Sequence, residues 1–436
     1  MKNVDKRHAT YLQQQPKRDV FAAVKNGTDA VREGKTLYLP MYPDELKGEY
    51  EVRLKMATID GIVQSGVDTL CGSVFHGDID TSKVNPAILP LLEDIDNKGT
   101  HFNIFARNAF DASFDGFSVI IVDTPNSDVP INSLGDEQRL GIRPYWRLYF
   151  AKDVINWRYD INPVSHAVEL ALLVLEEKTE EPKDIFETEM VTRYRVYRLD
   201  DQKRPIWELY RKADSASVSD EFALEDWGVL STSGIPAAII GCITDEPRLL
   251  VESRLEIKAY QKESSFDTIE YLSIPTLFTK GYEDENRLSL GASTHIRLPI
   301  EGDVGYVQID SAGHAELKST IATIKAYIST RLNELTNVSA SLPGGVGGAD
   351  KTATQAVIED RDKQARLILW AEQFKDALEL ALSFTAELLG MKPTDGGEII
   401  LQTKWEMARQ IREQMQAGLA KTDDGDDDSN DDSNDQ

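Results

Sequence analysis

Cysteine is almost missing from this chain, whose 436 residues include only Cys71 and Cys242. Two cysteines are too few for a disulfide framework or a thiolate metal site, which is typical of proteins in a reducing compartment. Long apolar runs are missing too, since none approaches the roughly 20 residues that a membrane-spanning helix needs. The polar residues 1–10 lack the apolar segment of a secretory signal. We therefore expect a soluble protein that is made in the cytoplasm and has no membrane partner.

Positive charge is scarce: 48 lysines and arginines face 74 aspartates and glutamates, which gives a net charge of −26. Eight of the aspartates lie in residues 423–435, and we expect residues 422–436 to be a disordered acidic tail. Proteins that bind nucleic acid tightly neutralise phosphates with cations, and this composition does the opposite on average. Any contact with DNA must therefore be local or weak.

Catalytic and ligand-binding motifs are also scarce. Residues 345–352 have the glycines of a phosphate-binding loop, but Asp350 stands where such a loop needs glycine. Asp78 and Asp80 could hold a cation, although the sequence places no third ligand beside them. The six histidines lie singly, without the spacing of a metal site: His8, His76, His101, His166, His295 and His314. We expect no enzymatic activity, cofactor or bound metal; a carboxylate-dependent hydrolase, suggested by the excess of acids, is the alternative.

The clearest pattern is a predicted helix–loop–helix over residues 314–390. Apolar residues recur at steps of three and four, the spacing of one helical face. In the first helix they are Leu317, Ile321, Ile324, Ile328, Leu332 and Leu335, and in the second Leu367, Trp370, Phe374, Leu378, Leu382 and Leu388. Residues 336–351 contain four glycines and a proline and cannot form a regular element. Residues 352–355 are typical of a capping box that starts the second helix, and Gly390 and Pro393 end it.

The rest of the chain predicts both helices and strands. Residues before Asp19 are expected to lie loosely on a surface or partner. Helices are expected over residues 20–31, 49–75 and 102–110, with another just before Lys98. A buried strand is expected at 117–123, and a period near two over 144–243 predicts a small antiparallel β module. Its strand candidates are residues 145–150, 167–176, 192–199, 207–211 and 237–243.

Two further helices, about 247–272 and 314–335, are predicted to pair, because a compact β-like insertion joins them. Residues 398–401 are expected to form a short strand and residues 405–419 a final helix. The chain thus predicts an α+β fold.

The order of these elements resembles that of the portal, or head-to-tail connector, proteins of tailed bacteriophages, in particular a subfamily long recorded in prophages as a domain of unknown function. The resemblance covers most of the chain. It rests on DGFSVIIVDTP at 115–125, AKDVINWR at 151–158, GIP at 234–236 and the helix–loop–helix at 314–390. It implies a portal-like fold with a helical stem, a long kinked helix, a β-rich wing module and a small clip insertion.

The resemblance also implies a division of the chain. The expected parts are a wing at 1–245, stem helices at 246–272 and 314–335, a clip at 273–313 between them, a tunnel loop at 336–351, a long helix towards the crown at 352–390, a crown at 391–421 and the acidic tail at 422–436. The short C-terminal part departs from better-known portals, so we expect a minimal crown.

Residues near DNA follow from the same resemblance. The tunnel loop would face DNA through Ser339, Ser341, Pro343, Gly344, Gly345, Val346, Gly347, Gly348 and Lys351. Lys318 and Lys325, seven residues apart on one helix, would face the stem lumen, and Lys280, Arg287 and Arg297 would lie in the clip. The alternative for these cations is an ordinary solvated face. For the stripe of the long helix, core packing and a subunit interface both stay open.

The function implied is structural. Portal proteins form a homo-oligomeric ring, usually a dodecamer, that is assembled in the host cytoplasm and occupies one capsid vertex of the virion. Double-stranded DNA is packaged and ejected through the ring without sequence specificity, and the terminase motor, head-completion or adaptor proteins and capsid proteins dock on it. An acidic wall with few lysines suits such a passage, since strong attraction would arrest the DNA. The alternative within structural proteins is a head-completion or capsid protein without a tunnel.

Overall fold

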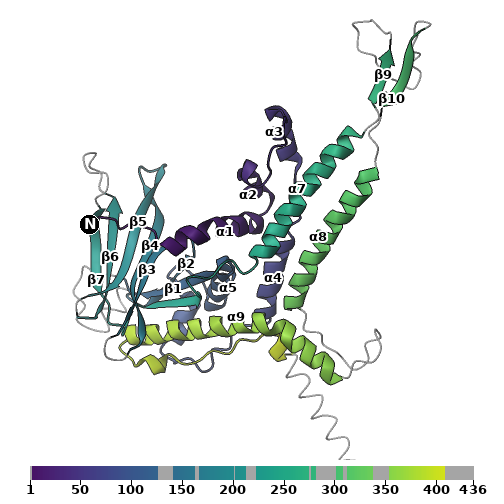
Figure 1. Cartoon of the computed structure of the whole chain (residues 1–436). Coiled ribbons are helices and arrows are strands. Elements are labelled where there is room, and N and C mark those ends of the chain that lie inside the picture. The colour runs from purple at the N-terminus through teal and green to yellow at the C-terminus, as the bar shows by residue number, and fades with distance from the viewer. Residues whose placement is uncertain are drawn as a thin grey trace, which may run out of the picture. The chain divides into compact units, whose positions relative to one another are not determined.

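The computed structural model describes residues 2–125, 141–162, 166–200, 202–212, 222–273, 276–280, 301–307, 312–336 and 353–407. Helices and strands are both abundant in it, which confirms the expected α+β class (Figure 1). The chain divides into two compact units. Unit 1 comprises residues 1–22, 64–250 and 331–436, and unit 2 comprises residues 23–63 and 251–330. Unit 2 therefore joins an N-terminal segment to the predicted helix pair; the expected wing, stem and crown boundaries stay predictions.

A three-stranded antiparallel sheet lies in the centre of unit 1. Its order is β2 (Tyr145–Phe150), β1 (Phe117–Asp123), β8 (Ala237–Gly241). Every residue of β1 is buried, as expected for a strand covered on both faces. The predicted strands at 117–123 and 145–150 are confirmed to the residue.

A second sheet of unit 1 is a five-stranded antiparallel meander. Its strands, in spatial order, are β3 (Val154–Ile161), β4 (Val168–Pro182), β5 (Thr188–Leu199), β6 (Pro205–Lys212) and β7 (Phe222–Val229). The predicted strands in this range are confirmed, although β4 and β5 are longer than expected. The two edge strands, β3 and β7, were not predicted, because polar and acidic residues interrupt their apolar pattern. Edge strands tolerate such residues, since one side faces no neighbour.

The N-terminal helix α1 (Ala9–Lys25) corrects the expectation that residues before Asp19 lie loosely. Pro16, inside the helix, removes one backbone donor and makes the segment look broken. Packing outweighs that loss, because Tyr11 is buried and its hydroxyl donates to the Lys152 carbonyl at 3.0 Å. The last elements before β1 are α4 (Ile62–Val74), the 3₁₀ turn η2 (Leu89–Asp94), α5 (Phe102–Ala112) and the 3₁₀ turn η3 (Ser113–Asp115).

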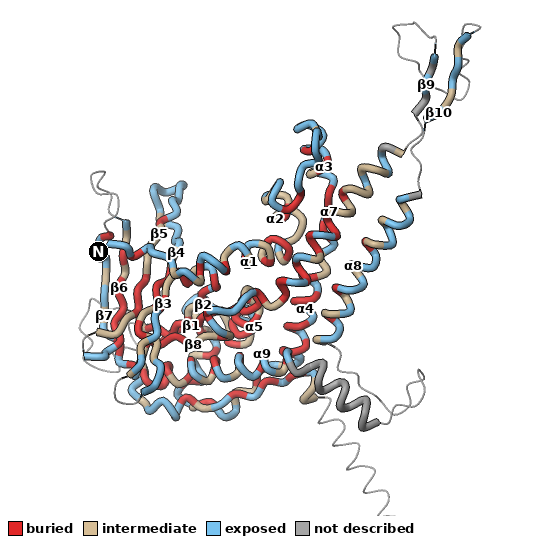
Figure 2. The backbone as a smooth tube through the Cα atoms, in the orientation of Figure 1, coloured by how far each residue is buried: buried red, intermediate tan, exposed pale blue. Residues whose placement is uncertain are grey.

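The long helix α9 (Ala353–Leu388) is confirmed as one element of 36 residues. Phe374, Leu378 and Leu382 on its stripe are fully buried, and Figure 2 shows the buried residues concentrated along its inner side. Gly390 follows with φ +76°, a left-handed value that ends helices, and the turn η4 (Pro393–Gly396) comes next. The predicted strand at 398–401 is reduced to isolated bridges that pair Asp80 with Ile400 and Val84 with Gly397. Thr352, the first residue of the expected capping box, lies outside the described residues. So do residues 408–419 of the expected final helix.

Unit 2 contains a long antiparallel helix pair. The helices are α7 (Leu250–Leu272) and α8 (Ala312–Thr336), and the hairpin of β9 (Thr276–Lys280) and β10 (Asp303–Val307) follows α7 and precedes α8. The His314 ring lies 3.1 Å from the Ser273 hydroxyl and 6.0 Å from the Phe266 ring, which joins the two helix ends nearest the hairpin. Both the predicted pair and its β-like insertion are confirmed.

The remainder of unit 2 is α2 (Thr28–Glu33), the turn η1 (Lys35–Leu37) and α3 (Lys47–Met56). The expected single helix over 49–75 is wrong, because α3 and α4 are separate. Ala57 has an extended conformation and Gly61 has φ +73°, and neither continues a helix. The apolar stripe alone could not reveal the break. None of the helices within the described ranges combines the length and apolarity that crossing a membrane requires.

Candidate functional site

The predicted tunnel loop falls largely beyond what the structure describes. Ser339, Ser341, Pro343, Gly344, Gly345, Val346, Gly347, Gly348 and Lys351 all lie outside the described residues. Its flanks are described: α8 ends at Thr336 and α9 begins at Ala353. Near the end of α8, Leu332 packs so closely on Gly66 that a Cβ at this glycine would lie 2.7 Å from a Leu332 methyl carbon. The C-terminal end of α8 therefore packs closely against α4, just before the predicted tunnel loop begins.

The two predicted stem lysines differ in their surroundings. Lys318 is exposed on α8, and its ammonium makes no ion pair with any described residue. Lys325 is half-buried, and its ammonium pairs with Asp60 at 2.5 Å and with Glu263 of α7. Burial alone would lower the pKa of Lys325, but the two carboxylates outweigh it and raise that pKa. Lys325 thus fastens α8 to its neighbours, and its charge is already neutralised.

The predicted clip cations are described in part. Lys280 is exposed at the last residue of β9, whereas Arg287 and Arg297 lie outside the described residues. The β9–β10 ribbon also exposes apolar side chains, with Tyr306 67% and Val307 58% exposed.

Sequence reasoning missed a group of cations on α7. Arg254 and Lys258 are exposed and Lys262 is half-buried, and they recur at steps of four residues. This regular spacing is visible in the sequence. What could not be seen was that this face of α7 is left uncovered.

Sequence reasoning also missed a network of buried charges between the two sheets of unit 1. Glu177 on β4 accepts hydrogen bonds from Arg195 Nε at 2.7 Å and from the Tyr149 hydroxyl at 2.5 Å. Asp123, at the end of β1, has its Oδ2 3.7 Å from Arg195 Nη1 and accepts a hydrogen bond from the hydroxyl of Tyr197 at 3.5 Å. Its members come from β1, β2, β4 and β5, so no short-range motif announces it.

The network is electrostatically matched. Burial raises the pKa of Asp123, which the neighbouring arginines oppose. Burial would also raise the pKa of Glu177, but Arg195 and the Tyr149 hydroxyl outweigh it, and this pKa is lowered. Burial raises the pKa of Tyr149, so that its hydroxyl stays a donor at neutral pH. Each acid therefore lies beside an arginine, and the network joins the two sheets.

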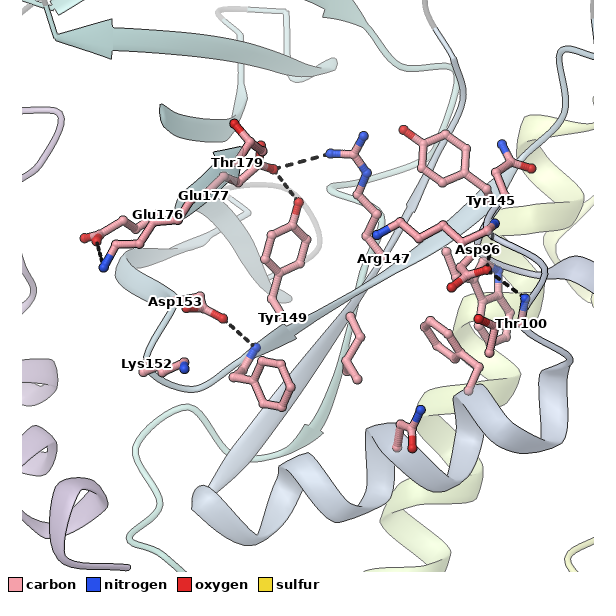
Figure 3. Close-up of a pocket in the computed structure, with 18 of the residues that line it drawn as sticks. Asp96, Thr100, Tyr145, Arg147, Tyr149, Lys152, Asp153, Glu176, Glu177 and Thr179 are labelled. Atoms are coloured by element: carbon pink, nitrogen blue, oxygen red, sulfur yellow. Dashed lines mark hydrogen bonds and ion pairs between the residues drawn. The ribbon is translucent and has the colours of Figure 1, made fainter. Parts of the chain in front are cut away.

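A pocket of about 1090 Å³ opens beside this network (Figure 3). Residues from α1, β2, β4 and the 96–108 segment line it, and Tyr149 points across it towards Glu177. Its charged lining residues are of both signs: Arg7, Lys98, Arg147, Lys152 and Lys178 against Asp96, Asp153, Glu176 and Glu177. Since the charges nearly balance, the pocket has no evident preference for an anionic or a cationic ligand.

Several of the histidines and Asp80 have structural contacts, and His295 lies outside the described residues. Asp80 Oδ1 accepts the Ser82 amide at 2.8 Å. His8 stacks on Trp157 at 4.3 Å between ring centroids, and His101 Nδ1 accepts the Asn103 amide at the start of α5. Within the described ranges no three histidine, cysteine, aspartate or glutamate side chains gather in a way that could hold a metal ion.

One family model matches part of the chain. It is described as a domain of unknown function, DUF4055, and it matches residues 251–389. This range begins within α7, contains the β9–β10 hairpin and α8, and ends just after α9. The description assigns no activity, and the match covers less than half of the chain. No curated protein matches this chain.

Proposed function

We propose that this chain is a structural subunit of a bacteriophage portal, a ring at one capsid vertex through which double-stranded DNA is packaged and ejected. The observation that carries the proposal is the order of elements from 250 to 388: α7, a two-stranded hairpin, the antiparallel partner α8, a glycine-rich segment and the 36-residue α9. The portal resemblance implies this order for stem, clip, second stem helix, tunnel loop and long helix. The family match spans the same block.

The incomplete cover of α8 supports assembly into a ring. Ile328 on its stripe is fully buried, but Leu317 and Ile324 are only half-buried, and Tyr327 is 51% exposed. A helix that leaves apolar surface open can bury more of it against a neighbouring copy. Copies packed side by side around an axis make heterologous contacts, and these close into a ring when the rotation allows.

The charge distribution supports passage of DNA without tight binding. The chain carries −26, and Lys325 is neutralised by two carboxylates. Repeating such a subunit around a bore gives a repulsive wall in which a few uncompensated cations set the local contacts. In this proposal the ring sits in the virion, and the terminase motor, adaptor and capsid proteins bind its outer surfaces.

The oligomeric state tests the proposal directly. We expect native mass spectrometry of the purified chain to give one large closed oligomer, and electron microscopy to show top views with a central hole. A monodisperse monomer over a wide concentration range would overturn the portal function.

A deletion of residues 339–348 separates a portal from a head-completion protein without a tunnel. We expect the variant to assemble but to package or retain DNA poorly. Particles that package and eject genomes normally would favour the protein without a tunnel.

A further inference from the structure

We infer that Arg254, Lys258 and Lys262 of α7, here called the α7 basic stripe, contact the phosphate backbone of duplex DNA. The inference rests on the proposed function, which it deepens by naming the surface that meets the polyanion. It also moves the expected contact from Lys325 of α8 to α7, because Lys325 is held by Asp60 and Glu263.

The stripe is one continuous face of the helix. Four residues advance an α-helix by about 6 Å and turn it by about 40°, so the three cations form a gently winding row about 12 Å long. Arg254 and Lys258 are exposed and Lys262 is half-buried. Among the residues that the structure describes, none of the three makes an ion pair or a side-chain hydrogen bond.

The acidic residues of α7 lie on the other side of the helix. With about 100° per residue, they fall within a sector of about 60°, and each is at least about 80° away from every cation of the stripe. They are Glu252, Glu256, Glu263, Asp267 and Glu270. Charge is therefore segregated around α7, which an ordinary solvated helix with mixed charges does not require.

The packing of unit 2 leaves the stripe uncovered. α8 covers the side of α7 that carries Glu263 and Phe266. Residues 38–63 cover the next side, where Gln261 Nε2 donates to the Tyr38 carbonyl at 2.8 Å and Glu256 accepts the Val63 amide at 2.8 Å. Val251, which shares the sector of the stripe, is 51% exposed. Tyr42 reaches this sector only beyond Lys262, where its hydroxyl donates to the Ser265 hydroxyl at 2.7 Å. Arg254 and Lys258 themselves stay exposed.

An exposed row of unpaired cations fits a phosphate backbone. Over about 12 Å a DNA duplex carries roughly seven phosphates, so each cation can meet one of them without reading the sequence. Arg254 can bind a phosphate through two N–H groups, while the lysines act as mobile point charges. Three contacts in each subunit give a weak interaction that many subunits share, which suits DNA that must slide.

Duplex binding as a function of salt tests the stripe. The chain would be titrated with a fluorescent 30-base-pair duplex of random sequence at roughly 50 to 200 mM salt, in parallel with the variant R254Q/K258Q/K262Q. Losing three phosphate contacts should make the slope of log K against log salt shallower by about 2.7 for each engaged stripe. The matched control K203Q/K212Q/K404Q removes three exposed lysines of unit 1 that, among the described residues, also make no ion pair, and it should leave the slope unchanged.

Native mass spectrometry of the same samples separates this inference from the portal function. A stripe variant that keeps the wild-type oligomer and loses the slope supports the inference. An unchanged slope, equal losses in the control, or a wild-type chain that binds no duplex at low salt overturns it, even if the ring is present. A monomeric wild type overturns the portal function, while the difference in slope between the two variants still decides the stripe.

Discussion

The helices α8 and α9 follow each other along the chain and carry the same kind of apolar stripe, yet they are buried differently. On α9, Phe374, Leu378 and Leu382 are 0% exposed. On α8, Leu317 is only half-buried and Tyr327 is 51% exposed. The stripe of α9 is thus buried more completely than that of α8, although α9 also exposes Leu369 by 51% and Leu380 by 43% away from its stripe. The spacing of apolar residues therefore predicts that a helix forms. How far those residues are buried in the structure shows whether the helix has apolar surface left for a partner.

The same contrast applies to charge. In unit 1, Glu177 and Arg195 are paired deep between two sheets, with side chains 10% and 8% exposed. In unit 2, Lys325 pairs at a half-exposed site, and the α7 basic stripe has no partner among the described residues. Buried pairs set the arrangement of strands and cost much to break, whereas exposed cations cost little and are free to bind. The predictions below test this contrast, from the largest expected effect to the smallest.

Equal leucine truncations on the two helices should have very different costs. Leu378→Ala removes a fully buried side chain from α9 and leaves a cavity, so we expect a loss of about 3–5 kcal/mol in the free energy of unfolding. Leu317→Ala on α8 should cost about 1 kcal/mol, since part of its surface already faces water. Urea unfolding measures both. Equal costs would show that α8 is as fully enclosed as α9.

The buried ion pair of unit 2 should be the next most sensitive. Arg53 and Glu45 side chains are 6% and 7% exposed, with Arg53 Nε 2.7 Å from a Glu45 oxygen. Glu45→Gln leaves the guanidinium without its counter-charge, and we expect a loss of about 3 kcal/mol. Asp29→Asn removes the same charge from the exposed Asp29–Arg32 pair and should cost less than about 0.5 kcal/mol. Similar losses in the two variants would contradict the assignment of Arg53 as a buried anchor.

These predictions depend on pairings that the sequence did not disclose. The strand at 117–123 was predictable to the residue because it is almost wholly apolar, and α9 because its apolar stripe persists over about six turns. Lys325 was predictable as a cation of α8, but its partners Asp60 and Glu263 are brought to it by folding. The charge network of unit 1 was missed for the same reason. The periodicity of apolar residues predicts where helices and strands form. Which charged side chains are paired depends on contacts between residues that are far apart in the sequence.

Acid and base should act in opposite directions on two buried glutamates. Burial raises the pKa of Glu256 even though it accepts the Ile62 and Val63 amides, whereas the pKa of Glu177 is lowered by Arg195 and Tyr149 against the effect of burial. The contribution of Glu256 to stability is therefore complete below the unfolded-state pKa, about 4.3, and is lost as pH rises through the raised native value. That of Glu177 is present above about 4.3 and is lost as pH falls through its lowered native value.

The variant Glu256→Gln tests the direction in which stability changes with pH. Relative to the wild type, the variant should gain stability as pH rises from about 4 to 7, because it no longer ionises a buried group. Urea unfolding at several pH values, with hydrogen exchange at the Ile62 and Val63 amides, measures the effect locally. Glu316→Gln, on the exposed side of α8, provides the matched control and should show no such trend. If the stability of the Glu256 variant and that of the wild type changed with pH in the same way, Glu256 would not be the cause of the pH dependence.

The exposed pair of Lys83 and Glu398 should have the smallest effect. Its atoms are 3.4 Å apart and its side chains are 59% and 66% exposed, so water and salt screen most of the attraction. Lys83→Gln should lower the free energy of unfolding by less than about 0.5 kcal/mol, and Glu398→Gln by the same amount. The backbone bridge of Val84 with Gly397 beside it does not involve either side chain and should survive in both variants. A loss above about 1.5 kcal/mol in either variant would mean that this part of unit 1 depends on its surface charges, and the contrast between buried and exposed pairs would fail there.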